Sequence, residues 1–200
     1  MTVATRTADI DRTTRETRIT GRLDLDGVGE VRVATGIGFL DHMLTALAFH
    51  AGWNLELTCR GDLEVDDHHT AEDCALALGA AIARAMGDRS GIVRFGTGHA
   101  PLDEALARAV VDLSGRPWPE IHLGLSREAI GGIACENLTH VLVSIAMAAG
   151  CALHVDVLRG ANDHHRAEAA FKAVALALRD ALAPGRSGVP STKGRLGVEV

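Results

Sequence analysis

Apolar and polar residues alternate along four short segments of the chain, at residues 18–27, 29–36, 107–115 and 119–125. Such alternation predicts strands that bury one face. Turn-forming residues end these segments, so we expect the first two, and likewise the last two, to pair antiparallel. Residues 54–61 and 152–160 each predict one further strand.

Helical spacing of apolar residues marks four other segments, at residues 39–51, 68–86, 136–149 and 164–182. The second and fourth are rich in Ala and Leu, which favours long helices. Asp67 and Asp163 stand at their starts, and we expect both to occupy N-cap positions.

The chain contains an internal duplication. His42 aligns with His140 at a shift of 98 residues, and the pattern His-His-x-x-Glu at residues 68–72 recurs at 164–168, a shift of 96. We therefore expect an α+β fold of two similar halves, each a mostly antiparallel sheet with helices on one face. The predicted units are a first half, a second half and a C-terminal loop, at residues 1–92, 93–183 and 184–200.

Composition narrows the possible partners. With 47% hydrophobic residues, the chain of 200 residues can bury a substantial core. A formal charge of -6 and the absence of a Lys/Arg-dense stripe argue against a nucleic-acid partner. No signal peptide and no apolar run long enough to span a bilayer are seen. We therefore expect no membrane association. The four cysteines lack C-x-x-C spacing, so we expect free thiols and a cytoplasmic location.

Adjacent histidines on a helix cannot easily bind one small cation. Successive side chains diverge by about 100°, whereas His68 and His69 lie about 40° and 60° from Glu72 on opposite sides. Each histidine of the pair is therefore expected to serve a different ion. The second copy, His164 and His165 with Glu168, presents the same divergent pair.

Two ions between two such helices would each take a histidine from either copy. Six imidazoles, including His42 and His140, and two carboxylates suit a first-row transition metal better than Mg or Ca. Four aspartates are candidates for holding the ring N–H groups: Asp66, Asp67, Asp73 and Asp163.

A single His-His pair is more often part of a solvated turn, and its pattern alone is weak. The repetition favours a metal site. Three histidines lack the pattern and are expected on the surface or in strands: His99, His122 and His154.

Several ordered motifs resemble those of the imidazoleglycerol-phosphate dehydratases. They are RTTRET, TGIGFLDHML, VDDHHTAED, PLDEA, DLSGRP, NDHHRAEAAFK and STKG, spread over nearly the whole chain. The resemblance implies a lyase of L-histidine biosynthesis that converts imidazole glycerol phosphate into imidazole acetol phosphate. It also implies two manganese ions per active site, which allow an imidazolate and a diazafulvene-like intermediate.

The resemblance further implies the roles of individual residues. One manganese would take His42, His69, Glu72 and His164, and the other His68, His140, His165 and Glu168. Glu16 would be the acid/base group beside the reacting carbons. Contacts to the substrate and its phosphate would come from His50, Arg94, Arg116, Lys172, Ser191 and Lys193.

The resemblance also bears on subunit assembly, and at one position the chain departs from the residue that is common in the family. The resemblance implies a homo-24-mer whose active sites lie between subunits. Ala46 stands where many members of the family have Gln, so one polar contact near the phosphate would be missing or replaced. Two further functions remain open at this point: a di-metal hydrolase and a non-catalytic assembly joined by metal ions.

Overall fold

The structure is a computed structural model that describes residues 5–194 and residue 196. The first half consists of β1 (Thr7–Thr13), β2 (Thr17–Asp24), β3 (Val31–Ala34), α1 (Gly38–Ala51), β4 (Asn54–Gly61) and α2 (His68–Met86). The second half begins with β5 (Phe95–Leu102), β6 (Ala105–Asp112) and β7 (Trp118–His122). It continues with β8 (Ala129–Ile130), β9 (Ile133–Ala134), α3 (Cys135–Ala149), β10 (Ala152–Arg159) and α4 (Asp163–Leu182).

The two halves have the same topology. The first sheet has the order β1-β2-β4-β3 and the second β5-β6-β10-β7, and β8 and β9 form a separate small hairpin. In each four-stranded sheet two neighbouring pairs are antiparallel, while β3 runs parallel to β4 and β7 runs parallel to β10. The α+β duplication predicted from the sequence is therefore confirmed.

The expected strand pairing was wrong. β2 and β3 do not pair with each other, because β4 lies between them, and β10 separates β6 from β7 in the same way. Alternation identifies a half-buried strand, but it carries no information about which neighbour completes its hydrogen bonds. Here the crossover connection through a helix decides which strand becomes the neighbour.

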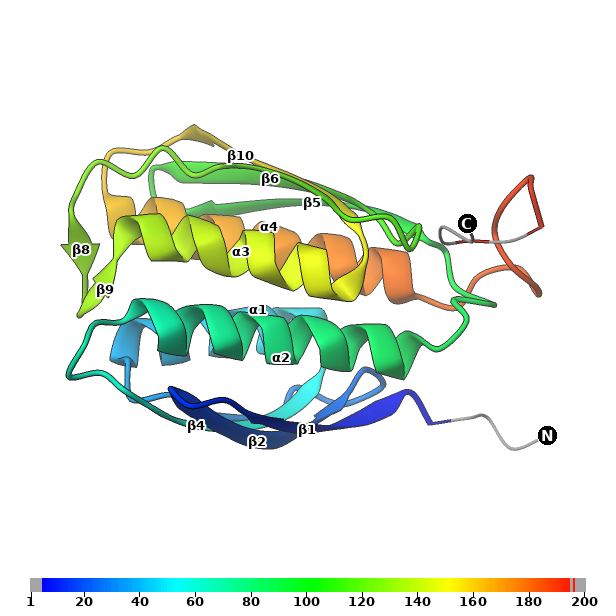
Figure 1. Cartoon of the computed structure of the whole chain (residues 1–200). Helices are drawn as coiled ribbons and strands as arrows, with labels where there is room; N and C mark the ends of the chain where they lie inside the picture. Colours follow the sequence, from blue (N-terminus) through cyan, green and yellow to red (C-terminus); the bar gives the residue numbers. More distant parts are fainter. Residues whose placement is uncertain (1–4, 195, 197–200) are drawn as a thin grey trace.

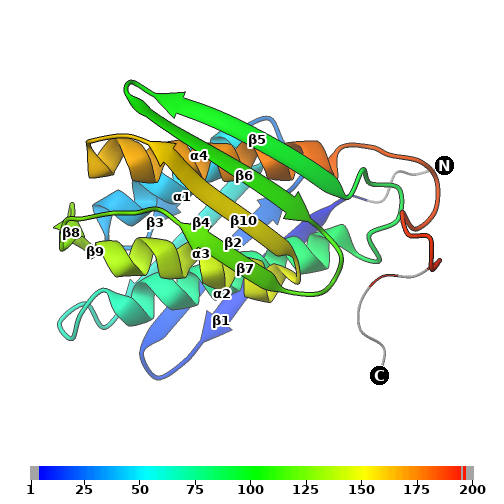
Figure 2. The same ribbon diagram turned by 90° about the horizontal axis from the view of Figure 1, so that it is seen from above.

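The molecule has four layers, with a sheet on each outer side and two layers of helices between them (Figure 1). Seen from above, β5, β6, β10 and β7 lie side by side over the helices (Figure 2). Across the middle, α1 packs on α4 and α2 packs on α3. Each pairing therefore joins one half to the other.

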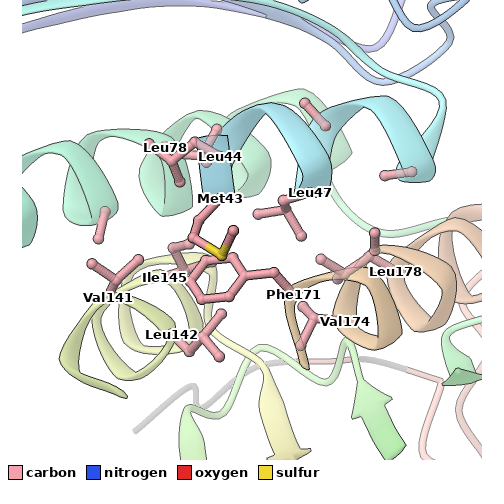
Figure 3. Packing of buried hydrophobic residues seen from close by; sticks show 14 of the residues in the cluster. Met43, Leu44, Leu47, Leu78, Val141, Leu142, Ile145, Phe171, Val174 and Leu178 are labelled. Carbon is pink, nitrogen blue, oxygen red and sulfur yellow. The ribbon is translucent and has the colours of Figure 1, made fainter. Parts of the chain in front are cut away.

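Apolar side chains fill the space between the halves. Met43 and Leu47 of α1 meet Ile145 of α3 and Phe171 of α4 in one cluster (Figure 3). The Phe171 side chain is completely buried. Removal of this apolar surface from water holds the helices, and the side chains at their N-terminal ends, in fixed relative positions.

Two glycines allow β5 to approach α4. A Cβ atom at Gly96 would lie 1.9 Å from the Ala177 carbonyl oxygen, and one at Gly98 would lie 2.1 Å from that of Ala173. Because glycines weaken the alternation signal, this edge strand was not predicted. Residues 184–194 form no helix or strand beyond an isolated bridge from Pro184 to Ile92. Among the residues described, no helix has the length and apolar character needed to cross a membrane.

Candidate metal centre

The start of α4 and the first turns of α1 bring three possible metal ligands together. The Glu168 Oε2 atom lies 3.0 Å from the His42 Nε2 atom and 3.2 Å from the His164 Nε2 atom. The His42 and His164 ring centroids are 5.7 Å apart. We call His42, His164 and Glu168 the first cluster.

The second cluster consists of His68, Glu72 and His140, from α2 and α3. The Glu72 Oε1 atom lies 2.9 Å from the His140 Nε2 atom, and its Oε2 atom lies 3.9 Å from the His68 Nε2 atom. The two imidazole rings are stacked, with centroids 5.2 Å apart. This cluster is the counterpart of the first under the internal repeat, residue for residue.

Each cluster therefore joins the two halves, as the duplication predicted. The donor atoms within each cluster all lie within 4.8 Å of one another. Ligands about 2.1 Å from a common ion cannot be much farther apart than about 4.2 Å, so small side-chain movements would close either cluster around a cation. Two imidazoles and one carboxylate suit a divalent first-row transition metal and leave coordination positions free.

His69 and His165 lie outside both clusters. The His69 Nδ1 atom is 3.0 Å from Asp62 Oδ2, and the His165 Nδ1 atom is 2.8 Å from Glu104 Oε2. These hydrogen bonds raise the pKa of each histidine, and accepting the bond from His165 is the main reason that the pKa of Glu104 falls to about 2. A carboxylate on Nδ1 leaves the Nε2 lone pair free to bind a metal.

Two of the three imidazoles of each implied ligand set lie together in the chain, whereas the third imidazole and the carboxylate of each set do not join them. His42 with His164, and His68 with His140, do lie together. Within one chain, however, Glu168 is beside the first pair and Glu72 beside the second, the reverse of the implied sets. The remaining ligands of those sets stay predictions that involve another copy of the chain.

The expected partners of the histidine rings were wrong. Asp62, Glu104 and Asn137 hold the rings, the last through its Oδ1 atom 2.9 Å from the His68 Nδ1 atom. The four predicted aspartates hold backbone or other side-chain groups instead: Asp66, Asp67, Asp73 and Asp163. Asp62 and Asn137 carry no sequence signal for this role, whereas Glu104 lies within the motif PLDEA.

Of the two expected N-caps, Asp67 is confirmed in that position and Asp163 is corrected. Asn162 is the N-cap of α4, and its side chain accepts a hydrogen bond from the His164 backbone N–H. Asp163 is already helical, and its Oδ2 atom binds the backbone N–H groups of Ser126 and Arg127. Asp67 is the N-cap of α2 but makes no side-chain cap bond; the preceding Asp66 binds the His68 N–H at 2.8 Å.

Glu16 lies in the turn between β1 and β2, close to the second histidine of α2. Its Oε1 atom is 3.8 Å from the His69 Nε2 atom, and about half of its side chain is exposed. The buried carboxylate of Asp73 fastens this turn, since it accepts hydrogen bonds from the Thr17 hydroxyl at 2.5 Å and the Arg12 guanidinium at 3.0 Å. Although burial opposes it, these bonds lower the pKa of Asp73.

The candidate phosphate contacts are divided between two parts of the molecule. The Arg94 backbone N–H binds the carbonyl of Ala181, near the C-terminal end of α4. Ala181 is 17 residues after His164, so the two residues are about 25 Å apart along the helix axis. The Arg94 guanidinium also binds the Asp112 carboxylate and the Pro190 carbonyl. Ser191 and Lys193 follow in the adjoining C-terminal segment, so these groups lie far from the first cluster of the same chain.

The other candidates are placed as follows. Arg116 lies in the turn before β7, next to the C-terminal end of α3. The Lys172 Nζ atom lies 2.6 Å from Glu168 Oε1, and hydrogen bonds from Lys172 and His42 outweigh burial and lower the pKa of Glu168 to about 2. His50 is further along α1, where burial and then the charge of Lys172 lower its pKa.

Ala46 is buried in α1. Four cysteines, which the sequence predicted to be free thiols, are free and buried: Cys59, Cys74, Cys135 and Cys151. His99, His122 and His154 are exposed on strands of the second sheet, as expected.

The duplicated α+β fold carries two repeat-related clusters of His and Glu that could each hold a metal ion. The family model for imidazoleglycerol-phosphate dehydratase matches residues 35–178. The chain belongs to this family, and its relatives carry the name of that enzyme.

Curated relatives support this assignment over almost the full chain. The imidazoleglycerol-phosphate dehydratase of Candida glabrata is 54% identical over 94% of this chain and 99% of its own length. That of Phytophthora nicotianae is 59% identical over 96% of this chain, which spans 42% of that longer protein.

Solved structures of this family resemble the fold of this chain. The imidazoleglycerol-phosphate dehydratase of Staphylococcus aureus is 36% identical with a TM-score of 0.80, covering 89% of this chain and 99% of that one. The Pyrococcus furiosus enzyme is 35% identical with a TM-score of 0.80, covering 94% of this chain and all of that one.

Proposed function

We propose that this chain dehydrates imidazole glycerol phosphate to imidazole acetol phosphate in L-histidine biosynthesis, with two manganese ions in each active site. The observation that carries the proposal is the pair of symmetry-related clusters. A substrate that is itself an imidazole has two ring nitrogens, and two cation positions match them in number. The family relationship supports the reaction and the choice of manganese.

The chemistry requires activation of the substrate ring, since the carbon proton to be removed has no carbonyl group beside it. Two bound cations would stabilise the ring as an anion and so weaken the bond to the neighbouring hydroxyl group. The residues of the chain would then position the ring, exclude alternative orientations and move protons.

We assign the proton transfers to Glu16. Its carboxylate is exposed towards the space beside His69, so a substrate held by the metal ligands could reach it. As the acid it would first give a proton to the departing hydroxyl group, which leaves as water, and the resulting carboxylate would then accept the carbon proton to give the enol of the product. The network around Asp73 keeps this turn beside α2.

We further propose that each active site combines residues of several chains in a homo-24-mer. Arg94, Ser191 and Lys193 lie too far from the first cluster of their own chain for one small phosphorylated substrate to span the gap. His165 lines an open depression together with Glu104 and Arg127, and its Nε2 lone pair remains available. A neighbouring chain could complete both ends of the site by symmetric association.

A cytoplasmic location is part of the proposal, because four buried free thiols suit a reducing compartment. A hydrolase with a metal-bridging carboxylate fits the clusters less well, since each has two imidazoles for one carboxylate. A purely structural role for the metal would give Glu16 no catalytic function.

The activity is tested with purified protein, Mn²⁺ and imidazole glycerol phosphate, by following the formation of imidazole acetol phosphate. We expect product with metal and none after chelation. Absence of product from a protein that retains two Mn²⁺ ions per chain would disprove the proposed reaction.

The composite site is tested by mixing two inactive variants, His42→Ala and Arg94→Ala, after dissociation with a chelator. Reassembly with Mn²⁺ should restore part of the activity, because some sites would combine an intact His42 with an intact Arg94. If each site were built from a single chain, the mixture would remain inactive.

A further inference from the structure

The two clusters are equivalent under the repeat, but the residues that support them are not. In the second cluster Asn137 accepts a hydrogen bond from the His68 Nδ1 atom at 2.9 Å. At a shift of 98 residues, the counterpart of Asn137 is Phe39, which has no hydrogen-bonding side chain. The Phe39 ring packs edge-on against His164, with centroids 4.9 Å apart.

The orientation of the Asn137 amide is determined by Asp67. The Asn137 Nδ2 atom lies 2.9 Å from Asp67 Oδ2, which also accepts a bond from the Ala134 backbone N–H. A carboxylate can only accept, so the amide must turn its NH₂ group to Asp67 and its oxygen to His68. His68 then carries its proton on Nδ1, and its Nε2 lone pair is directed to the metal position.

The first cluster lacks this support. Within the described part of the chain, the His164 Nδ1 atom has no hydrogen-bond acceptor. Asp163, the counterpart of Asp67, binds Ser126 and Arg127 within its own half instead. Among the described residues, no neighbouring side chain therefore holds the proton of His164 on Nδ1, and in the metal-free chain the Glu168 carboxylate, 3.2 Å from Nε2, favours the proton on the nitrogen that would face the metal.

The imidazoles of the two clusters are about equally exposed. The side chains of His42 and His164 are 45% and 41% exposed, against 43% and 36% for His68 and His140. The carboxylates do differ: Glu168 is only 12% exposed and pairs with Lys172 at 2.6 Å, whereas Glu72 is 36% exposed. Both this ion pair, which competes with a cation for Glu168, and the missing hydrogen bond to the ring weaken the first cluster relative to the second. Loss of such a hydrogen-bond partner typically weakens metal binding by about 10- to 100-fold.

We propose that the two metal positions are unequal: the one built on His68 and His140 binds its cation first and tightly, and the one built on His42 and His164 binds second and exchanges more readily. The inference rests on the proposed two-metal function. It depends only on the imidazole pairs, so it holds whichever chain supplies the remaining ligands. Asn137 acts here as a positioning residue, through His68.

Titration of the metal-free full chain with Mn²⁺ tests this, with calorimetry for affinity and the electron paramagnetic resonance signal of free Mn²⁺ for stoichiometry. We expect two classes of site, one ion per chain in each, with dissociation constants at least about 10-fold apart. Asn137→Leu should weaken the tight class to about the affinity of the other. Ser144→Ala, another buried polar position of α3, is the matched control and should change neither class.

His42→Ala and His140→Ala provide a second test that leaves the core intact, since both rings are about two-fifths exposed. His42→Ala should retain one tightly bound ion per chain, and His140→Ala only weak binding. Two equal sites, or an unchanged tight class in Asn137→Leu, would overturn the inference and leave the proposed reaction standing. A chain that binds no Mn²⁺ would overturn the two-metal function itself.

Discussion

Replacement of Asp73 by Ala should loosen the turn that carries Glu16. The Asp73 side chain is only 8% exposed and accepts bonds from Arg12, Thr14 and Thr17. Loss of the carboxylate that accepts from the buried Thr17 hydroxyl, which would keep only its 3.2 Å contact with the Thr14 hydroxyl, costs about 1–3 kcal/mol. Loss of the Arg12 pair adds about 1 kcal/mol, because the Arg12 side chain is 38% exposed and water replaces part of the interaction.

We therefore expect Asp73→Ala to lower the free energy of unfolding of the metal-free chain by about 2–4 kcal/mol, measured by urea denaturation. The turnover number should fall on the order of tenfold through displacement of Glu16, with the bound metal unchanged. Asp180→Ala, at an exposed acid of α4, serves as the control and should stay within about 0.5 kcal/mol of wild type. A loss below about 0.5 kcal/mol for Asp73→Ala, or unaltered turnover, would refute the reasoning.

Three other changes have defined outcomes. Glu16→Gln should reduce turnover by about 10²- to 10⁴-fold at constant metal content, measured by product formation and metal analysis; near-normal turnover would remove its acid/base role. The Glu104–His165 pair should stabilise the metal-free chain at pH values above 4.5, the ordinary pKa of a Glu carboxyl group. This contribution is lost at low pH, as Glu104 is protonated near its lowered pKa of about 2, and at higher pH, as His165 loses its proton at its raised pKa. Glu104→Gln should accordingly lower the pKa of His165 in an NMR titration, and an unchanged value would contradict the pairing. Phe171→Ala should cost about 3–5 kcal/mol in urea denaturation because it leaves a cavity between the halves; a much smaller loss would mean that the helices close the gap.

Local patterns predicted the elements of this fold better than their arrangement. The repeat of His68 and His69 at His164 and His165 was sufficient to predict two halves and two ion positions, because a duplicated sequence folds twice into the same unit. Strand order was not predictable in this way, since β4 enters between β2 and β3 only after α1 has crossed over. The edge strand with Gly96 and Gly98 was missed because its glycines serve the packing of α4 rather than the sheet.

The same limit applies to the site. The ligands themselves carry a spacing signal, which the helix geometry explains. The groups that hold them, Asp62, Glu104 and Asn137, come from other elements and acquire their roles only through tertiary contacts. Aspartates adjacent in sequence to the histidines were the natural candidates, but the helix starts there and directs their carboxylates to backbone N–H groups.

The central claim is that each metal ion is held by one histidine from either half. Anomalous diffraction from crystals of the manganese-loaded protein, recorded near the manganese absorption edge, would test it most directly. We predict two peaks per chain, one between His42 and His164 and the other between His68 and His140. A single peak, or peaks away from these pairs, would contradict it.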